Sequence, residues 1–308
     1  MQTTLAVLDD ELLSEFPNCR FTIDIAVAAL SETRLSDEGS LNEMASGYTF
    51  FWKGLPVESR CIHGVGFAIR TKLLQTLPES PAAISERLMT LRIHLAKHRH
   101  AIFISTYAPT LPSEDETKDH YYVMLRSTLM QVTRSKKLIV HGDFNARIDS
   151  DSTIWGNVIG KHGVGNINSS GHRLLILCSE FGLFVTNRLL QLKHKHKETW
   201  MHPRSEHWHL LYYVLVKAVD LQDVQITRVM RGAECWIGHR LVRTSLRIRI
   251  RPHPENRNLS VGLTSAAWAE EQTCSAYVQP CRLILHRSQI VQLCRFKAAR
   301  MLQNSGTH

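Results

Sequence analysis

The sequence predicts one α/β domain in which sheets pack under helices. Short runs of β-branched and apolar residues, typical of strands, recur along most of the chain, and a few segments with helical spacing lie between them. We find no internal repeat. With 308 residues, 44% of them hydrophobic and 21% charged, the chain is long enough for a sizeable core and has the composition of a soluble globular protein.

In the first half, apolar residues at helical spacing predict a short helix over residues 5–16, which Pro17 ends. The helix expected over residues 114–132 has acidic residues in its first turns, where they suit the helix dipole. Apolar and polar residues alternate most cleanly in 89–95, which indicates a half-buried strand. The strands predicted in this half cover residues 23–30, 64–70, 89–95, 101–107 and 137–143.

The second half begins with a loop over 148–170 that is rich in Gly, Asn and Ser, and a helix is expected over 171–182. A polar loop with His and Trp residues follows over 194–209. The predicted strands of this half cover residues 183–187, 210–216, 224–229 and 241–250. In the last of these strands Arg247, Arg249 and Arg251 share one face, which we interpret as a solvated strand face.

Charge and cysteine content bound the function. The net charge of +9 and the pI near 9.3 favour an anionic partner, nucleic acid first. The seven cysteines are scattered and form no C-x-x-C pair, as expected of reduced thiols in a nuclear or cytoplasmic, intracellular protein. The sequence predicts neither a signal peptide nor an apolar stretch of membrane-spanning length. We therefore expect no membrane partner.

The most informative segment is 137–147, in which an apolar run ends at Gly142 and is followed by Asp143 and Asn145. Residues two apart at the end of a strand can point the same way. Open α/β folds place their chemistry at such strand ends. A carboxylate and a carboxamide in this arrangement suit the positioning of a water and the binding of a phosphate oxygen.

An ordered set of fragments resembles the endonuclease/exonuclease/phosphatase superfamily, in particular its retrotransposon-derived branch of craniofacial development protein 2-like proteins. The fragments are 29–34, 47–52, 64–70, 105–109, 142–147, 159–165, 199–205, 207–210 and 235–242. The resemblance implies a four-layer α/β sandwich of two packed sheets flanked by helices, with the active site at one sheet edge. It covers residues 20–251, between an atypical N-terminal segment, 1–19, and a basic C-terminal tail of unknown structure, 252–308.

The resemblance implies a Mg²⁺-dependent phosphodiesterase or DNA endonuclease. Glu32 corresponds to the family's metal ligand, and Tyr107 to a tyrosine near the scissile phosphate. Asp143 would orient the attacking water, and Asn145 would bind the phosphate or the same water. The remaining expected site residues are His239, which would contact the phosphate and stabilise developing charge, and Asn187, which would lie near the substrate cleft.

The chain departs from the family pattern at three places. Tyr212 stands where relatives carry an aspartate, and Gly238 stands where a second aspartate directly precedes the histidine. We expect the acid before the histidine to accept a hydrogen bond from the imidazole, as in a catalytic triad. Nothing in residues 1–20 matches the family's N-terminal strand, so an edge strand is expected to be missing. Loss of even one preorganised polar group costs roughly two to three powers of ten in rate, so impaired catalysis is expected.

Two further patterns concern ligands. The histidines at 94, 98, 100, 194, 196, 207 and 209 lack the cysteine or carboxylate that would complete a structural zinc site, so zinc is disfavoured. Basic and aromatic residues mix in the loop over 193–208, as they do in nucleic-acid grooves, and a solvated loop anchored by its tryptophans is the alternative. Its predicted substrate contacts are Trp200 and Arg204.

Three functions are therefore compatible with the sequence. The first is a nuclease-type domain of mobile-element origin with weak or no hydrolysis. The second is an active Mg²⁺-dependent endonuclease in which another acid, such as Glu234 or Asp220, substitutes for those lost. The third is a protein that binds nucleic acid, or another partner, through its basic surface without chemistry.

Overall fold

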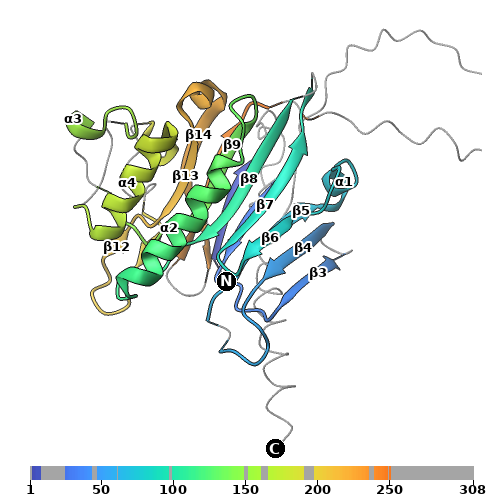
Figure 1. Ribbon diagram of the computed structural model, residues 1–308, viewed down its shortest axis with the longest axis horizontal. Helices are drawn as coiled ribbons and strands as arrows, with labels where there is room; N and C mark the ends of the chain where they lie inside the picture. The colour runs from blue at the N-terminus through green and yellow to red at the C-terminus, as the bar shows by residue number, and fades with distance from the viewer. Residues whose placement is uncertain are drawn as a thin grey trace, which may run out of the picture.

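The computed structural model describes residues 2–7, 25–43, 47–60, 62–96, 99–148, 152–160, 166–190, 198–235, 239–248 and 250 (Figure 1). Of residues 2–7, 152 and 231–235 it describes the backbone only. The C-terminal segment 252–308 and Lys193, Lys195, Lys197 and Gly238 lie outside the described residues, as do Arg249 and Arg251.

The strands of the described residues form two sheets. The nine-stranded sheet has the order β12-β11-β15-β1-β2-β5-β4-β3, with β14 also paired to β15. Its strands are β1 (Gln2–Val7), β2 (Val27–Ser31), β3 (Glu38–Glu43), β4 (Tyr48–Lys53), β5 (Val65–Arg70), β11 (Trp200–Met201), β12 (Trp208–His209), β14 (Val224–Cys235) and β15 (His239–Leu246).

The six-stranded sheet has the order β10-β13-β9-β8-β7-β6. Its strands are β6 (Ala82–Ser85), β7 (Leu88–His94), β8 (His100–Tyr107), β9 (Lys137–Asp143), β10 (Leu183–Val185) and β13 (Tyr212–Lys217). The helices are α1 (Thr71–Leu74), α2 (Asp115–Met130), α3 (Ser152–Trp155) and α4 (Ser169–Phe181), with 3-10 turns η2 (Thr186–Arg188) and η4 (Ala218–Asp223).

Two cores follow from the alternation of side chains along the strands. Ile139 of β9 joins the core between the sheets, together with Phe67 of β5, whereas Val140 joins the core under the helices, together with Leu125 of α2. Figure 1 shows α2 and α4 side by side on the six-stranded sheet. The predicted α/β fold of two packed sheets with flanking helices is confirmed.

The N-terminus differs from the prediction. Gln2–Val7 is a strand, not the start of a helix, and it lies inside the nine-stranded sheet, parallel to β15 and antiparallel to β2. The predicted helix over 5–16 is therefore wrong at its start, and so is the expectation that the N-terminal strand is missing. Pairing with two strands distant in sequence outweighs the weak helical spacing.

Smaller differences concern the ends of elements. The last strand ends at Leu246, so Arg247 lies beyond it and the expected arginine face is not part of β15. The predicted loop over 148–170 contains the short helix α3, and the loop over 194–209 contains the paired strands β11 and β12. Helix α4 ends as predicted at Gly182, whose φ of 59° is the left-handed conformation that suits glycine. None of the helices in the described ranges is long and apolar enough to cross a membrane.

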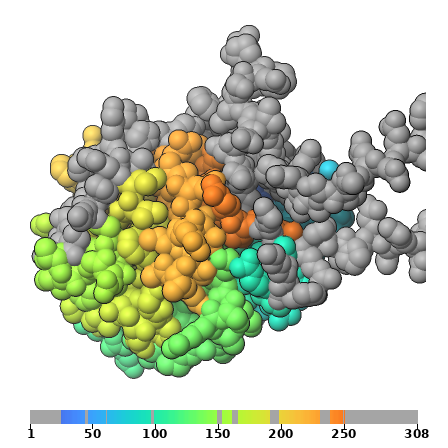
Figure 2. Space-filling model, turned by 90° about the horizontal axis from the view of Figure 1, so that it is seen from above, coloured from blue at the N-terminus to red at the C-terminus, as the bar shows by residue number. Residues whose placement is uncertain are grey.

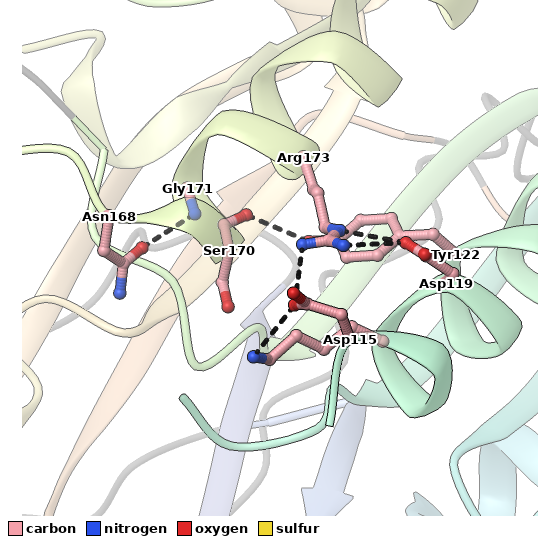
Figure 3. A network of polar contacts seen from close by, with 8 residues as sticks. Asp115, Asp119, Tyr122, Asn168, Ser170, Gly171 and Arg173 are labelled. Atoms are coloured by element: carbon pink, nitrogen blue, oxygen red, sulfur yellow. Dashed lines mark hydrogen bonds and ion pairs between the residues drawn. The ribbon is translucent and has the colours of Figure 1, made fainter. Parts of the chain in front are cut away.

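Polar contacts fix α4 to α2 (Figure 3), and one more fixes it to the loop that follows β9. Arg173 of α4 reaches Asp119 (2.8 Å) and Asp115 (3.4 Å) of α2. At the start of α4, the side-chain oxygen of Asn168 accepts the N–H of Gly171 (2.8 Å) and also that of Arg147 (3.0 Å). The segment just after Asp143 is thereby held by the N-terminal cap of α4.

Candidate active site

Several expected site residues lie at one end of the two sheets. Tyr107 and Asp143 end the parallel strands β8 and β9 and are register partners. Tyr212 begins β13, which runs antiparallel to β9, and it lies opposite Asp143. Glu32 directly follows β2 of the other sheet. Gly142 allows β9 to lie close to β8, because a Cβ at this position would sit 1.9 Å from the Thr106 carbonyl oxygen.

Two buried serines join the sheets beside this site. The hydroxyl of Ser31 donates to the carbonyl oxygen of Thr106 (3.1 Å), and the hydroxyl of Ser105 donates to that of Leu30 (3.2 Å). Both serines are at most 1% exposed, so these hydrogen bonds are shielded from water. They place the end of β2 against the end of β8.

Glu32 consequently contacts Tyr107. The Tyr107 hydroxyl donates to Glu32 Oε1 (2.7 Å), and Arg34 Nη2 donates to Glu32 Oε2 (3.2 Å). The Glu32 side chain is 15% exposed, so its carboxylate is still reachable from solvent. Glu32 has a φ of 50°, a strained conformation for a residue other than glycine, and such strain is often found at functional sites.

Arg87 and His63 pack against Tyr107 and hold it in place. Arg87 Nη1 donates to the Tyr107 carbonyl oxygen (3.3 Å), and the guanidinium lies 5.5 Å from the centre of the tyrosine ring. Arg87 Nη2 also lies 2.8 Å from His63 Nε2. Burial and the charge of Glu32 raise the pKa of Tyr107, so its hydroxyl stays protonated and acts as a donor.

Asp143 is 2% exposed, and its carboxylate accepts the backbone N–H of Asn145 (2.9 Å). Burial raises the pKa of Asp143 to about 8, and the nearby charge of Glu32 adds to the effect, while hydrogen bonds from Asn145 and from the Tyr212 side chain oppose it. Asn145 has a φ of 46°, which asparagine tolerates, and its Nδ2 donates to the carbonyl oxygen of Ala108 (2.9 Å).

His239 begins β15 and contacts Tyr212. The Tyr212 hydroxyl lies 2.7 Å from His239 Nδ1. Burial lowers the pKa of His239 to about 4, so the imidazole is neutral near pH 7. We expected a hydrogen bond from the imidazole to an acid at position 238, but residue 238 lies outside the described residues. Among the described residues, Tyr212 is a hydrogen-bond partner of the imidazole.

Asn187 hydrogen-bonds to the backbone at the start of β13. Its Nδ2 donates to the Tyr212 carbonyl oxygen (3.0 Å), and its Oδ1 accepts the N–H of Val214 (2.9 Å). The side chain thus fixes the start of β13, and the residue is 5% exposed. A substrate contact for Asn187 stays a prediction.

Trp200 and Arg204 lie on the segment that forms β11, a turn and β12. Trp200 is the register partner of His239, and the two rings lie 6.3 Å apart. The side chain of Arg204 is exposed in the turn. Next to them, the Arg240 guanidinium stacks on the Trp208 ring at 3.2 Å from its centre.

Asp220 cannot take part in this site. Its Oδ1 pairs with Lys137 Nζ (2.8 Å), and Lys137 begins β9 whereas Asp143 ends it. Figure 2, seen from above Figure 1, shows this opposite end, where the orange surface of the segment with η4 borders the green surface that leads into β9. The expectation that Asp220 substitutes for a lost acid is therefore wrong, and the side chain of Glu234 lies outside the described part.

Sequence reasoning missed the residues that hold the site together. Ser31 and Ser105 gave a weak signal, because Ser31 directly precedes Glu32 and Ser105 lies two positions before Tyr107 on a buried strand. Arg87 and His63 gave none, because they reach Tyr107 only through the pairing of distant segments. Tyr212 was noted only as a lost acid, and its contact with the imidazole was not expected.

Mg²⁺ binds to proteins through one or two carboxylates and keeps several waters. Within the described ranges, no three His, Cys, Asp or Glu residues are grouped as a complete metal site. The reachable carboxylate of Glu32, with Asp143 close enough to feel its charge, fits this minimal demand. Burial is the main cause of the raised pKa of Asp143 and disfavours its ionised form, which a divalent cation nearby would stabilise.

No family model matches the chain. It is 24% identical over 233 residues to craniofacial development protein 2 of Bos taurus, a match that covers 76% of this chain and 38% of that protein. The chain thus spans about two fifths of the length of this relative. Among solved structures, the catalytic domain of Xenopus laevis APE2 has a TM-score of 0.55 at 12% identity, covering 74% of this chain and 85% of the other. The AP endonuclease LMAP of Leishmania major has a TM-score of 0.50 at 15% identity, covering 75% and 79%.

Proposed function

From the endonuclease/exonuclease/phosphatase fold of this chain, we propose that it is a Mg²⁺-dependent phosphodiesterase of the DNA endonuclease type, with impaired catalysis. One observation carries the proposal. Glu32, Tyr107, Asp143 and His239 meet at one end of the two sheets, and a neutral phenol, Tyr212, occupies the place of an expected acid.

Each residue has a distinct task in phosphodiester hydrolysis. Ionised Asp143 accepts a hydrogen bond from the attacking water and orients it, with Asn145 beside it at the end of β9. The Tyr107 hydroxyl donates its proton to Glu32 Oε1 and so positions this carboxylate near the scissile phosphate. His239 would contact the phosphate and stabilise developing charge once its imidazole carries a proton on Nε2. Mg²⁺ held by Glu32 would neutralise charge on the phosphate as a Lewis acid.

Impairment follows from the charges. In the absence of a cation, a carboxyl with a pKa of about 8 is largely protonated at pH 7 and orients water poorly. Arg34 already pairs with one oxygen of Glu32 and competes with Mg²⁺ for it. The loss of one preorganised charged group lowers the rate by roughly a hundred- to a thousandfold.

DNA as substrate is supported by the charge and by the surface beside the site. The net charge is +9, Trp200 is the partly exposed register partner of His239, and Arg204 is exposed in the turn that follows β11. The origin from a retrotransposon endonuclease belongs to the same proposal and rests on the sequence resemblance. A nuclear or cytoplasmic, intracellular location is also part of it and rests on the cysteine content.

The test is nicking of supercoiled plasmid DNA with Mg²⁺ and with EDTA. We expect little or no nicking by the unmodified chain and a gain when Tyr212→Asp and Gly238→Asp are combined. Glu32→Ala in the double variant is the matched control and should abolish the gain. Robust nicking by the unmodified chain that depends on Glu32 would contradict the impairment and support an active endonuclease.

The non-catalytic alternative is favoured by one observation, the Arg34–Glu32 ion pair that covers the metal ligand. It predicts DNA binding that weakens with salt but is unaffected by EDTA and by Asp143→Ala. Absence of DNA affinity at low salt would exclude both this alternative and DNA as the substrate.

A further inference from the structure

Tyr212 lies between the two groups whose proton positions matter most to the site. It is the cross-strand partner of Asp143, so both side chains point to the same face of the sheet, into the space between the sheets. Its hydroxyl hydrogen-bonds to the Asp143 carboxylate and lies 2.7 Å from Nδ1 of His239. Tyr212 is 2% exposed and His239 8%, so water does not compete strongly for these bonds.

Counting protons sets the direction of this chain of hydrogen bonds. A phenol has one proton to donate, and an ionised carboxylate can only accept. When the hydroxyl of Tyr212 donates to Asp143, its oxygen is left as an acceptor for His239. The imidazole is neutral and carries a single ring proton, which is then on Nδ1, and Nε2 is left as the acceptor.

The backbone of Tyr212 is held as firmly as its hydroxyl. Asn187 Nδ2 donates to the Tyr212 carbonyl oxygen (3.0 Å), and the Tyr212 N–H donates to Thr199 Oγ1 (3.3 Å). Thr199 is fully buried, and its hydroxyl also accepts the N–H of Leu211 (2.9 Å). A tyrosine clamped on both sides of its Cα can hold a precise hydroxyl position.

We propose that Tyr212 is a positioning residue whose hydroxyl links Asp143 to His239 and, while Asp143 is ionised, keeps the imidazole proton on Nδ1. The phenol thereby does part of the work of the acid that it replaces, since it fixes the tautomer and the ring orientation. It does not supply the negative charge that would stabilise an imidazolium. The role in hydrolysis rests on the proposed function, whereas the tautomer does not.

The test is the tautomer of His239, measured by two-dimensional ¹H–¹⁵N NMR of the full chain with ¹⁵N-histidine, without DNA or Mg²⁺. A pH of 9 keeps Asp143 ionised and His239 neutral. Because the chain has 17 histidines, the spectrum of His239→Asn assigns the signal. Tyr212→Phe removes only the hydroxyl, and Asp143→Ala removes its acceptor but keeps the phenol.

We expect the Nδ1–H tautomer in the unmodified chain, a mixture of tautomers in Tyr212→Phe, and a shift to Nε2–H in Asp143→Ala, where the freed hydroxyl donates to Nδ1. An unmodified chain with mainly Nε2–H would overturn the proposal, and so would an unchanged signal in Tyr212→Phe. If Tyr212→Phe does not fold, as judged by circular dichroism, the Asp143→Ala signal decides alone, and no shift there overturns the link.

The rate of plasmid nicking is a second measurement of the role of Tyr212. In the Gly238→Asp background, which keeps the phenol, Tyr212→Phe should lower kcat by roughly ten- to a hundredfold, as for other residues that orient a reacting side chain, with little change in KM. Absence of nicking in every variant, the Tyr212→Asp/Gly238→Asp double variant included, would count against the proposed function alone, because the tautomer result is obtained without substrate.

Discussion

Replacing His141 with leucine should make the protein more stable, and the gain should grow as the pH falls. His141 lies on β9 between the two sheets, is 1% exposed, and stacks on Phe103 with 5.9 Å between ring centres. Neither ring nitrogen has a hydrogen-bond partner among the described residues. Burial lowers the pKa of His141 from 6.5 to about 3.

The sign of the pH effect follows from proton binding. Between pH 6.5 and about 3 the unfolded chain protonates His141 and the folded protein does not. The unfolded state therefore binds more protons in this window, and the free energy of unfolding falls by about 1.4 kcal/mol for each unit of pH lost. At pH 4.5 this amounts to about 2.7 kcal/mol, and over the whole window to at most about 5 kcal/mol.

The assay is urea unfolding of the unmodified chain and of His141→Leu at pH 7.5 and pH 4.5. At pH 7.5 the variant should be more stable by about 1–3 kcal/mol, since two buried nitrogens without partners are removed. At pH 4.5 the difference should be larger by about 2–3 kcal/mol, while all other titrating groups cancel between the two proteins. His120→Leu, at an exposed position of α2, is the matched control and should change stability little at either pH. The same difference for His141→Leu at both pH values would refute the reasoning.

Three further predictions concern the site. Asp143 has a folded pKa of about 8, above its ordinary 3.8, so its contribution to stability is complete below pH 4 and is lost as the pH rises through 8. Thermal unfolding without Mg²⁺ should thus show Asp143→Asn more stable than the unmodified chain at pH 8.5 but not at pH 4. Asn187→Ala should lower the free energy of unfolding by about 2–4 kcal/mol, because two buried backbone groups of β13 lose their partners; an unchanged urea midpoint would contradict this. Gly142→Ala places a Cβ 1.9 Å from the Thr106 carbonyl oxygen, and a cost of about 3 kcal/mol or more should appear as loss of soluble protein, with Gly182→Ala as a milder comparison.

Much of the fold could be predicted where the signal is local. Buried parallel strands such as β8 and β9 have continuous apolar runs, and Asp143 was expected in the site because it ends such a run. Tyr107, which ends β8, was expected there only from the family resemblance. Helices α2 and α4 have clear starts and ends, including Gly182. These features depend on residues within a few positions of one another.

The N-terminal strand could not be predicted in this way. Gln2–Val7 has no strong pattern of its own, and its partners, β2 and β15, lie about 25 and 240 residues further along the chain. The same limit applies to Tyr212 and His239, which are 27 positions apart. From the sequence, tyrosine in place of an aspartate indicates only a loss of charge. Whether the Tyr212 hydroxyl reaches His239 depends on the distance between the two sheets, which the sequence does not give.

The scaffold of the site is largely separate from its charged groups. The hydrogen bonds of Ser31 and Ser105 join the sheets, and Thr199 and Asn187 hold the start of β13, yet none of these side chains is ionisable in the relevant range. Substitution of an acid therefore alters the chemistry without removing what positions Glu32, Asp143 and His239. The scaffold also restricts how activity could return. Aspartate at position 212 would stand opposite Asp143, whose pKa burial and Glu32 already raise, so the added carboxylate would depend on a cation to keep both acids ionised. Any nicking regained by the double variant should thus rely on Mg²⁺ more steeply than the residual activity of the unmodified chain.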